Sequence, residues 1–552
     1  MAGTIRVSNV VRILFLGLLA IGFVSATVVG DNRPKPPYRV LYSNDTTHIL
    51  TNISPYHGRR EPFRPEMLEA SVDETAGTGV DVHILQPGMG WVPWWHSKVY
   101  PYGEHVRWMK ERFGVDPPRG GFEAYMAEGG DLVKVFVDRC HLRGLAPFIS
   151  IRLNDGHRLE EAVSPPGSKN LKYSWHSLSR FYVEHPEYRL GNNPNVWEER
   201  VLNWVYPEVR NYRLQFIREI CAGYDIDGLE LDFMRYYSYF RLAETTRAQR
   251  VEIMTEFVRT VRQVLDQTAK PGQRRWLCVR VPAILAMHDA LGINLPAMVR
   301  NGVDMVNVSA SYFTEQQNDF ARIRQLIPEA AVYLEMAHSA YNYRSDLNLP
   351  GAYDNFQYRR VTDEQFYTTA HLAYSRGYDG VSLFNFVYYR EHTAPELGPF
   401  HEPPFPIINH LGDPAWLAGQ PQHYFLASGF VPRGYTKRQL PIKYNRGQAH
   451  GFTMDLAPPR RGWRGKGRMR IQCDRRLGER QFSVSLNGKR LKPVSDCSEP
   501  YQNPYRPFLG GPEYHRAWAV PAKLLRPGPN QIDLKLEKGE TVQVLYLDLA
   551  VK

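Results

Sequence analysis

The sequence predicts an α/β protein: a (β/α)8 TIM barrel followed by a C-terminal, jelly-roll-like all-β sandwich. Eight short apolar, β-branched runs alternate with segments of helical periodicity, which is typical of parallel strands joined by helices. After about residue 420, alternating apolar and polar positions with turn signals replace the helical patterns. A chain of 552 residues also exceeds the usual size of one domain. We therefore expect a barrel over residues 27–420 and a sandwich over 421–552.

Residues 1–26 have the features of a secretory signal peptide. Arg6 and Arg12 precede a short apolar run, 13–26, which ends in the small residues Val24-Ser25-Ala26. An uncleaved anchor is the alternative, although the run is short for a membrane span. No later hydrophobic run is long enough to cross a membrane. We expect an exported protein, periplasmic or extracellular, with no stable membrane span after signal removal.

The barrel prediction depends on strands and helices that alternate along the chain. Three helical segments are predicted, at 207–224, 248–267 and 362–378. In the first, Val209, Tyr212 and Phe216 recur at helical spacing. The third begins with Thr362 as a helix cap, with Gln365 three residues later. A doubly wound open sheet is the alternative, but no glycine-rich phosphate loop follows the first strand. The predicted strands are 39–45, 81–88, 145–155, 227–235, 277–283, 304–312, 332–338 and 379–386.

Two features describe the predicted sandwich. Asn487-Gly488 is a strong hairpin-turn signal. Segment 520–536 resembles the late part of the galactose-binding-like jelly rolls attached to sugar-processing enzymes, and this resemblance makes the domain a candidate carbohydrate-binding module. Cys473 and Cys497 lie in the same region and could form a disulfide after export; two unpaired thiols are the alternative.

Two carboxylates in the fourth strand pose the main chemical question. Glu230 and Asp232 are two residues apart, so both should face the same side of the strand. A buried charge is costly unless it is paired. We expect Arg152 or Arg280, from the flanking strands, to pair with the deeper Glu230, which would leave Asp232 available to a ligand. A structural ion-pair network that includes both acids is the alternative.

The active site of a (β/α)8 barrel lies at the carboxyl ends of its strands. Asp232 and Glu335 end different strands, so they could face each other across the barrel mouth. Two such carboxylates are the apparatus of glycoside hydrolysis, in which one protonates the leaving oxygen and the other attacks or activates water. We expect Asp232 and Glu335 to be catalytic. The expected substrate-binding residues are Glu230, Arg235, Asn44, Asp45, Trp91, Arg152, Asn154, Arg280, Asn307, Tyr312, His338 and Asn385.

Trp91 belongs to an aromatic loop after the second strand, together with Trp94, Trp95 and Tyr102. These rings could supply stacking faces for sugars. A hydrophobic lid packed on the barrel is the alternative.

Three motifs around the fourth strand resemble one known family. They are His185-Pro186-Glu187, Pro207-Glu208-Val209-Arg210 and Asp225-Ile226-Asp227-Gly228. They are similar to motifs of the glycosyl hydrolase-like bacterial barrel family, also called family-10 glycosylhydrolase-like. That family usually ends this strand with adjacent acids, whereas this chain has Glu230-Leu231-Asp232-Phe233. The resemblance implies a sugar-active barrel in the cell envelope or outside the cell.

Other chemistries find less support in the sequence. The histidines form no His-x-x-x-His pair on a helix, and no Gly-x-Ser-x-Gly elbow is present, so we expect neither a metal nor a cofactor. The net charge of +11 and the basic run 460–470 are compatible with an anionic polysaccharide. In an exported protein we do not expect nucleic-acid binding.

Two functions from different classes follow. The first is an exported glycoside hydrolase that acts on a poly- or oligosaccharide by two-carboxylate general acid/base or nucleophilic catalysis. The second is a non-catalytic carbohydrate-binding barrel of the cell envelope. A third interpretation keeps the enzyme but pairs Asp232, as nucleophile, with an acid other than Glu335. A carboxyl separation of about 5–5.5 Å indicates a retaining enzyme and about 6.5–9.5 Å an inverting one. A much wider separation, or an arginine bound to either acid, favours the binding protein.

Overall fold

The computed structural model describes residues 34–45, 62–116, 121–342, 358–387, 403–427, 439–504 and 510–551. The predicted signal peptide lies outside these residues. Within them, no helix combines the length and apolar character that a membrane crossing requires.

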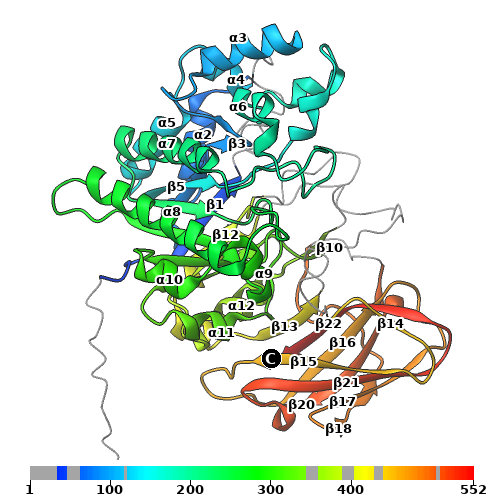
Figure 1. Ribbon diagram of the computed structural model, residues 1–552. Coiled ribbons are helices and arrows are strands. Elements are labelled where there is room, and N and C mark those ends of the chain that lie inside the picture. Colours follow the sequence, from blue (N-terminus) through cyan, green and yellow to red (C-terminus); the bar gives the residue numbers. More distant parts are fainter. Residues whose placement is uncertain are drawn as a thin grey trace, which may run out of the picture. The chain divides into compact units, whose positions relative to one another are not determined.

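Eight parallel strands close into a barrel, which confirms the predicted fold class (Figure 1). Each predicted strand is present: six are shortened by one to four residues, and two keep their length but begin one residue earlier. Neighbours pair in the order β1-β12-β9-β8-β7-β6-β5-β2. The strands are β1 (Val40–Asp45), β2 (Val82–Gln86), β5 (Ala146–Arg152), β6 (Gly228–Asp232), β7 (Trp276–Pro282), β8 (Met305–Ser309), β9 (Ala331–Ala337) and β12 (Gly380–Phe384).

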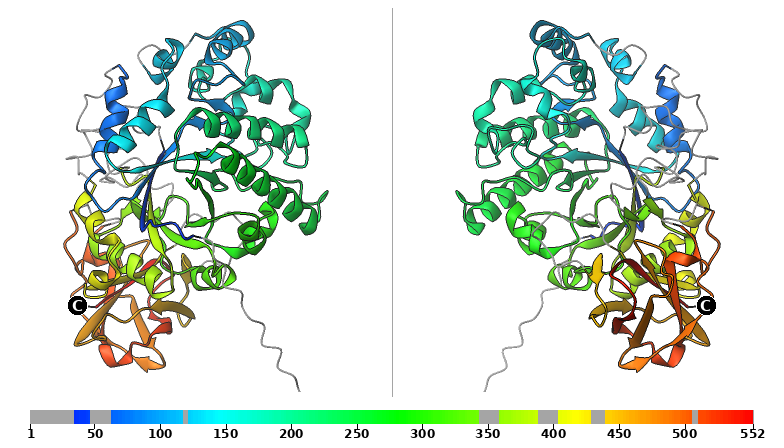
Figure 2. Two further views of the ribbon diagram at one scale, coloured as in Figure 1. Left: turned by 90° about the vertical axis from the view of Figure 1, so that its left-hand side faces the viewer. Right: turned by 90° about the vertical axis from the view of Figure 1, so that its right-hand side faces the viewer.

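Helices lie around the outside of the strands (Figure 2). The three predicted helices are present as α7 (Pro207–Gly223), α8 (Arg247–Thr268) and α12 (Asp363–Ser375). Pro207 opens α7, where its missing N–H costs nothing. The other α-helices of the barrel region are α2 (Pro65–Asp73), α3 (Tyr102–Phe113), α4 (Phe122–Ala127), α5 (Leu132–Leu142), α6 (Arg180–Glu184), α9 (Leu285–Leu291), α10 (Leu295–Arg300), α11 (Phe320–Leu326), α14 (Ile408–Leu411) and α15 (Pro414–Leu417).

The barrel interior changes from apolar to polar along its axis. At the amino ends of the strands, a cluster that includes Leu41, Phe148, Trp276 and Tyr333 fills the interior. Strand alternation then places a second set of inward residues nearer the carboxyl ends. That set is polar or charged and buried; it consists of Ser43, Asp45, Gln86, Ser150, Arg152, Glu230, Asp232, Arg280, Asn307, Ser309, Glu335 and Ser382.

The C-terminal region forms two antiparallel sheets over a shared core. Asn487 and Gly488 both have positive φ, 50° and 77°, and join β17 to β18, as the hairpin signal predicted. One sheet contains β13 (Gln422–Ala427), β14 (Ile442–Tyr444), β16 (Lys466–Cys473), β19 (Lys492–Val494), β20 (His515–Pro521) and β22 (Val542–Val551). The other contains β15 (Ala449–Leu456), β17 (Gln481–Leu486), β18 (Lys489–Arg490) and β21 (Gly528–Lys538).

The cysteines of the sandwich do not pair in the structure. Cys473 is a buried thiol in β16, and Cys497 is a partly exposed thiol whose Sγ lies 3.7 Å from the carbonyl oxygen of His515. The disulfide alternative is therefore not realised, and the two-thiol alternative describes this region.

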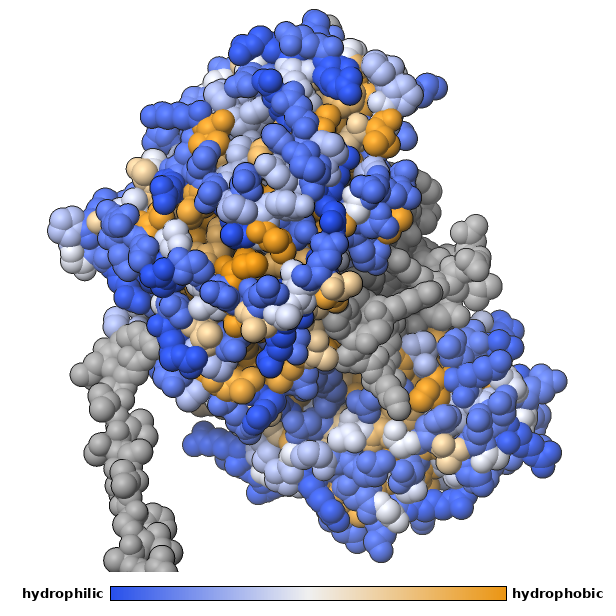
Figure 3. Space-filling view, in the orientation of Figure 1, coloured by the Kyte–Doolittle hydropathy of each residue, from blue (hydrophilic) through white to orange (hydrophobic). Residues whose placement is uncertain are grey.

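Most of the face seen in Figure 3 is hydrophilic, with hydrophobic residues in scattered patches. Scattered apolar side chains are normal on a soluble surface and mark no binding site by themselves. The polar end of the barrel interior is therefore the candidate site.

Candidate functional site

Strand register decides which inward side chains become neighbours at this end of the barrel. Asp232 of β6 is paired in register with Arg152 of β5 and with Arg280 of β7. Glu230, one inward position deeper, is flanked by Ser150 and Cys278. The two acids on one strand therefore meet different environments, since arginines flank one and small neutral side chains flank the other.

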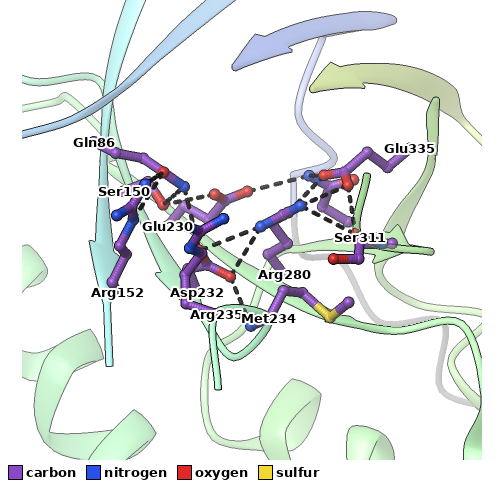
Figure 4. Close-up of polar contacts among 12 residues, drawn as sticks. Gln86, Ser150, Arg152, Glu230, Asp232, Met234, Arg235, Arg280, Ser311 and Glu335 are labelled. Carbon is purple, nitrogen blue, oxygen red and sulfur yellow. Dashed lines mark hydrogen bonds and ion pairs between the residues drawn. The ribbon is translucent and has the colours of Figure 1, made fainter. Parts of the chain in front are cut away.

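Arg280 binds both predicted catalytic acids (Figure 4). Its Nε and Nη2 donate to the two carboxylate oxygens of Glu335 at 2.6 and 2.7 Å, and its Nη1 lies 3.2 Å from both oxygens of Asp232. The three side chains are at most 1% exposed. Burial alone would lower the pKa of Arg280, but the Glu335 and Asp232 carboxylates raise it well above its usual value. The three residues form one buried ion-pair network.

Further hydrogen bonds complete the coordination of these acids. Gln86 donates to Asp232 at 3.2 Å, and the backbone N–H of Met234 donates to it at 2.7 Å. Ser309 Oγ and Asn307 Nδ2 donate to Glu335, the latter at 3.2 Å. Both carboxylates therefore accept further hydrogen bonds besides those from Arg280.

Glu230 does not pair with an arginine, contrary to the expectation from the sequence. Its oxygens accept hydrogen bonds from Ser150 Oγ at 2.8 Å and Asn307 Nδ2 at 3.2 Å, and Cys278 Sγ lies 3.7 Å away. Burial raises the pKa of Glu230 to about 7; Arg280 opposes this shift and the Asp232 carboxylate adds to it. Near neutral pH, a large share of Glu230 is therefore protonated.

Arg152 holds a second buried network beside the first. It forms ion pairs with Asp45 at 2.8 Å and Asp155 at 2.9 Å, and it donates to Gln86 Oε1 at 2.9 and 3.1 Å. Because Gln86 also donates to Asp232, its amide connects the two networks. Burial would raise the pKa of Asp155, but its charged neighbours His157 and Arg152 keep it well below the usual value.

The outermost polar residues are His157, Arg235 and Tyr312. His157 Nδ1 contacts Asp155, and its Nε2 lies 2.8 Å from Arg235 Nη2. Arg235 also donates to the hydroxyl of Tyr312. The His157 side chain is 30% exposed, which makes it the most accessible titratable group of the two connected networks.

Three of the predicted binding amides bind the protein itself. Asn154 bridges two loops, because its amide donates to the carbonyls of Leu202 and Ser238 and accepts from the N–H of Leu202. Asn385 accepts from the backbone N–H of Asp45 at 2.7 Å. Asn307 connects the two buried glutamates. These amides position the site's backbone and acids.

Asn44 and His338 also differ from the expected arrangement. Leu41 and Asp45 of β1 point into the barrel, so alternation directs Asn44 to the outer face with Tyr42, where it is buried. Within the part of the chain that the structure describes, its two side-chain polar atoms have no hydrogen-bond partner. His338 is buried and contacts Arg360 of β11 (Tyr358–Arg360), which pairs with β10 (Ser339–Asn342).

Trp91 is packed inside the protein, as the lid alternative predicted. It has no exposed surface, and its ring lies 6.2 Å from that of Tyr212 in stacked orientation. The Arg213 guanidinium lies 3.8 Å from the ring centroid. The short β3 (Gly88–Met89) and β4 (Val92–Pro93) hold this loop. Because the indole has no exposed surface, the loop does not offer Trp91 to a sugar.

The site includes five residues that the predicted catalytic and binding set lacked: Gln86, Ser150, Asp155, His157 and Ser309. Inward parity at a strand end was the available signal for Gln86, Ser150 and Ser309. Neutral residues of this kind occur at many strand ends, so this signal has little specificity.

Arginine at both acids constrains the possible chemistry. A carboxylate that an arginine keeps ionised can act as a nucleophile or stabilise positive charge, but it is a poor general acid. Glycoside hydrolysis needs two carboxyl groups in different roles, whereas Asp232 and Glu335 are held by the same arginine. The arrangement satisfies the condition that favours a binding protein.

No protein-family model matches the sequence, and no curated protein sequence matches it. Similar solved structures include a cycloisomaltooligosaccharide glucanotransferase from Paenibacillus sp., complexed with cycloisomaltoheptaose (11% identity, TM-score 0.31, 93% of this chain and 57% of that chain covered). A second is a Streptomyces plicatus β-hexosaminidase in complex with GlcNAc (14%, TM-score 0.38, 69% and 64% covered). A third is an α-amylase from Geobacillus thermoleovorans, complexed with acarbose (12%, TM-score 0.36, 92% and 98% covered).

The chain thus spans less than two thirds of the length of the first two structures. Because all three TM-scores are below 0.4, we argue the function from the side chains of this chain.

Proposed function

We propose that the protein is an exported carbohydrate-binding barrel in which Asp232, Arg280 and Glu335 form a structural network. The observation that carries the proposal is the single buried arginine bound to both acids. A carboxyl group bound to an arginine is a poor proton donor, and both acids are bound to the same arginine. The sugar would then be recognised at the carboxyl end of the barrel, outside this network.

The class of ligand rests on the architecture and on charge. A (β/α)8 barrel presents its loops for binding at the carboxyl ends of the strands, and a second all-β domain follows it. The exposed cations Arg460, Arg461, Arg464 and Lys466 lie on the loop before and at the start of β16. They are compatible with an anionic polysaccharide as the partner.

A glycoside hydrolase is the second candidate, and Glu230 favours it. Its pKa of about 7 makes it a carboxyl group that keeps a proton near neutral pH, on the same strand face as Asp232. Two carboxyl groups whose environments differ in this way are typical of acid and nucleophile pairs. In this case Asp232 would be the ionised group and Glu230 the proton donor, which follows the third interpretation of the sequence.

One experiment separates these candidates. The secreted protein is incubated with neutral and sulfated polysaccharides; binding is measured by affinity electrophoresis and cleavage by release of reducing ends. The binding proposal predicts retarded migration in at least one polysaccharide without release of reducing ends. If the wild type releases reducing ends and this release disappears in both Asp232→Asn and Glu230→Gln, the binding proposal is wrong and the protein is a hydrolase.

Export is tested separately. The charged start, short apolar run and Val24-Ser25-Ala26 end predict a mature protein that begins near Thr27. N-terminal sequencing of exported material checks this. Exported protein that still begins at Met1 would contradict it.

A further inference from the structure

An exposed aromatic ring lies next to the polar end of the barrel. Trp197 belongs to the long connection between β5 and α7, and 44% of its surface is exposed. Among the described residues, it is the only tryptophan in the exposed class. Exposure alone marks no binding site, so the surroundings of the ring decide what it can do.

The ring is held in a fixed orientation. It stacks on Tyr236, with centroids 4.0 Å apart and an interplanar angle of 16°, and the Arg200 guanidinium lies 5.7 Å from the centroid of the Trp197 ring. Tyr236 lies four residues after the end of β6 and is only 1% exposed. On Gly156, a Cβ atom would lie 2.8–2.9 Å from atoms of the Tyr236 ring, so the backbone there approaches this ring closely. Trp197 therefore stacks on Tyr236, whose ring is fixed by its contacts at the end of the barrel.

Tyr236 also connects Trp197 to the polar networks. The ring of Tyr236 meets that of His157 edge-to-face, with centroids 5.7 Å apart. His157 in turn contacts Asp155 and Arg235. Tyr236 thus lies between the exposed ring of Trp197 and the partly exposed imidazole of His157, which in turn contacts Arg235.

We propose that Trp197, held by Tyr236 and with Arg200 beside its ring, is a sugar-stacking subsite that takes one pyranose ring. The apolar C–H face of a pyranose suits a flat aromatic ring, and the hydroxyl groups at its edge suit the polar neighbours. A platform fixed by Tyr236 loses little conformational entropy when a ligand binds. This inference rests on the proposed carbohydrate function and assigns the contact that function requires.

A purely structural role for Trp197 is the competing explanation, since the indole also shields Tyr236 from water. The two roles differ in the chemistry they require. Shielding needs only apolar bulk, which leucine supplies, whereas stacking needs an aromatic face, which phenylalanine retains. The variants Trp197→Leu and Trp197→Phe therefore separate the two roles even if Trp197→Ala fails to fold.

The probe is a mixture of the methyl pyranosides of glucose, galactose, mannose, xylose and fucose, observed by saturation-transfer difference NMR with the full-length secreted protein. The control is Trp416→Ala, which removes a tryptophan of α15 that stacks on His410 with centroids 3.9 Å apart, outside the polar networks. Melting temperatures are measured for every variant.

We expect saturation transfer to at least one pyranoside in the wild type, in Trp197→Phe and in Trp416→Ala. In Trp197→Leu the affinity should fall about tenfold, since a favourable aromatic contact is worth up to about 1.5 kcal/mol. Unchanged transfer in Trp197→Leu would overturn the subsite and leave the carbohydrate function standing. Absence of transfer to every pyranoside in the wild type, together with normal migration in every polysaccharide, would overturn both.

Discussion

The contrast between Glu230 and Asp232 shows what residue-level chemistry can and cannot be predicted. Period-two alternation correctly indicates that both acids face the barrel interior. It does not identify their partners, because these depend on the register between neighbouring strands. Register places Arg280 beside Asp232 and Cys278 beside Glu230, so the arginine contact expected for one acid is made by the other.

Glu230→Gln tests the consequence of this environment for stability. The pKa of Glu230 rises from 4.5 to about 7 on folding, so the folded protein binds the proton more tightly than the unfolded chain. The contribution of Glu230 to the free energy of unfolding is therefore complete below about pH 4.5 and decreases as pH rises toward 7. The loss reaches about 3 kcal/mol, at 1.36 kcal/mol per pKa unit.

Urea unfolding of wild type and Glu230→Gln at several pH values measures this loss. The variant should lack this part of the pH dependence and be relatively more stable at pH 8 than at pH 4.5. Parallel pH profiles for the two proteins would contradict the raised pKa.

Strands and helices were predicted from the sequence more accurately than the partners of individual side chains. All eight strands were predicted, because buried parallel strands appear as short apolar runs and helices separate them. The aromatic loop around Trp91 could not be assigned in the same way. Its composition suits stacking on a ligand or packing on the protein, and only the contact with α7 decides for packing.

The start of α8 shows how local sequence stabilises one element. Thr246 and Gln249 form a capping box: the side chain of each accepts a hydrogen bond from the backbone N–H of the other, at 3.3 and 2.9 Å. Thr246→Ala removes one of these bonds and should lower the free energy of unfolding by about 1 kcal/mol. Denaturant unfolding measures this, with Thr260→Ala, at a partly exposed mid-helix position, as the control. An equal loss in both variants would contradict a specific role for the cap.

For the whole molecule, contacts between barrel and sandwich residues matter most. The predicted change of pattern near residue 420 falls between α15 and β13, yet Lys35–Lys552 form one compact unit. Gln365 of α12 donates to the hydroxyl of Tyr546 at 2.6 Å. Gln316 accepts from the backbone N–H of Phe425 at 2.9 Å. Side-chain contacts across a domain boundary leave no signal in the sequence.

These contacts predict that barrel and sandwich unfold together. Scanning calorimetry of the purified protein should show one transition, because unfolding either part leaves buried polar groups of the other without partners. Gln316→Ala together with Gln365→Ala should lower the transition temperature or divide the transition. Two separate transitions in the wild type would contradict this coupling.

The central claim is that Arg280 stabilises the barrel by pairing Asp232 and Glu335. The most direct test is the free energy of unfolding of Arg280→Met. Arg213→Met is the control, because Arg213 is buried against Trp91 and forms no ion pair with any acid among the described residues. Arg280→Met should lose about 3–5 kcal/mol, since it leaves two buried carboxylates without their counter-ion. The triple variant Asp232→Asn, Arg280→Met, Glu335→Gln should recover much of that loss. Wild-type stability in Arg280→Met, or no recovery in the triple variant, would contradict the account.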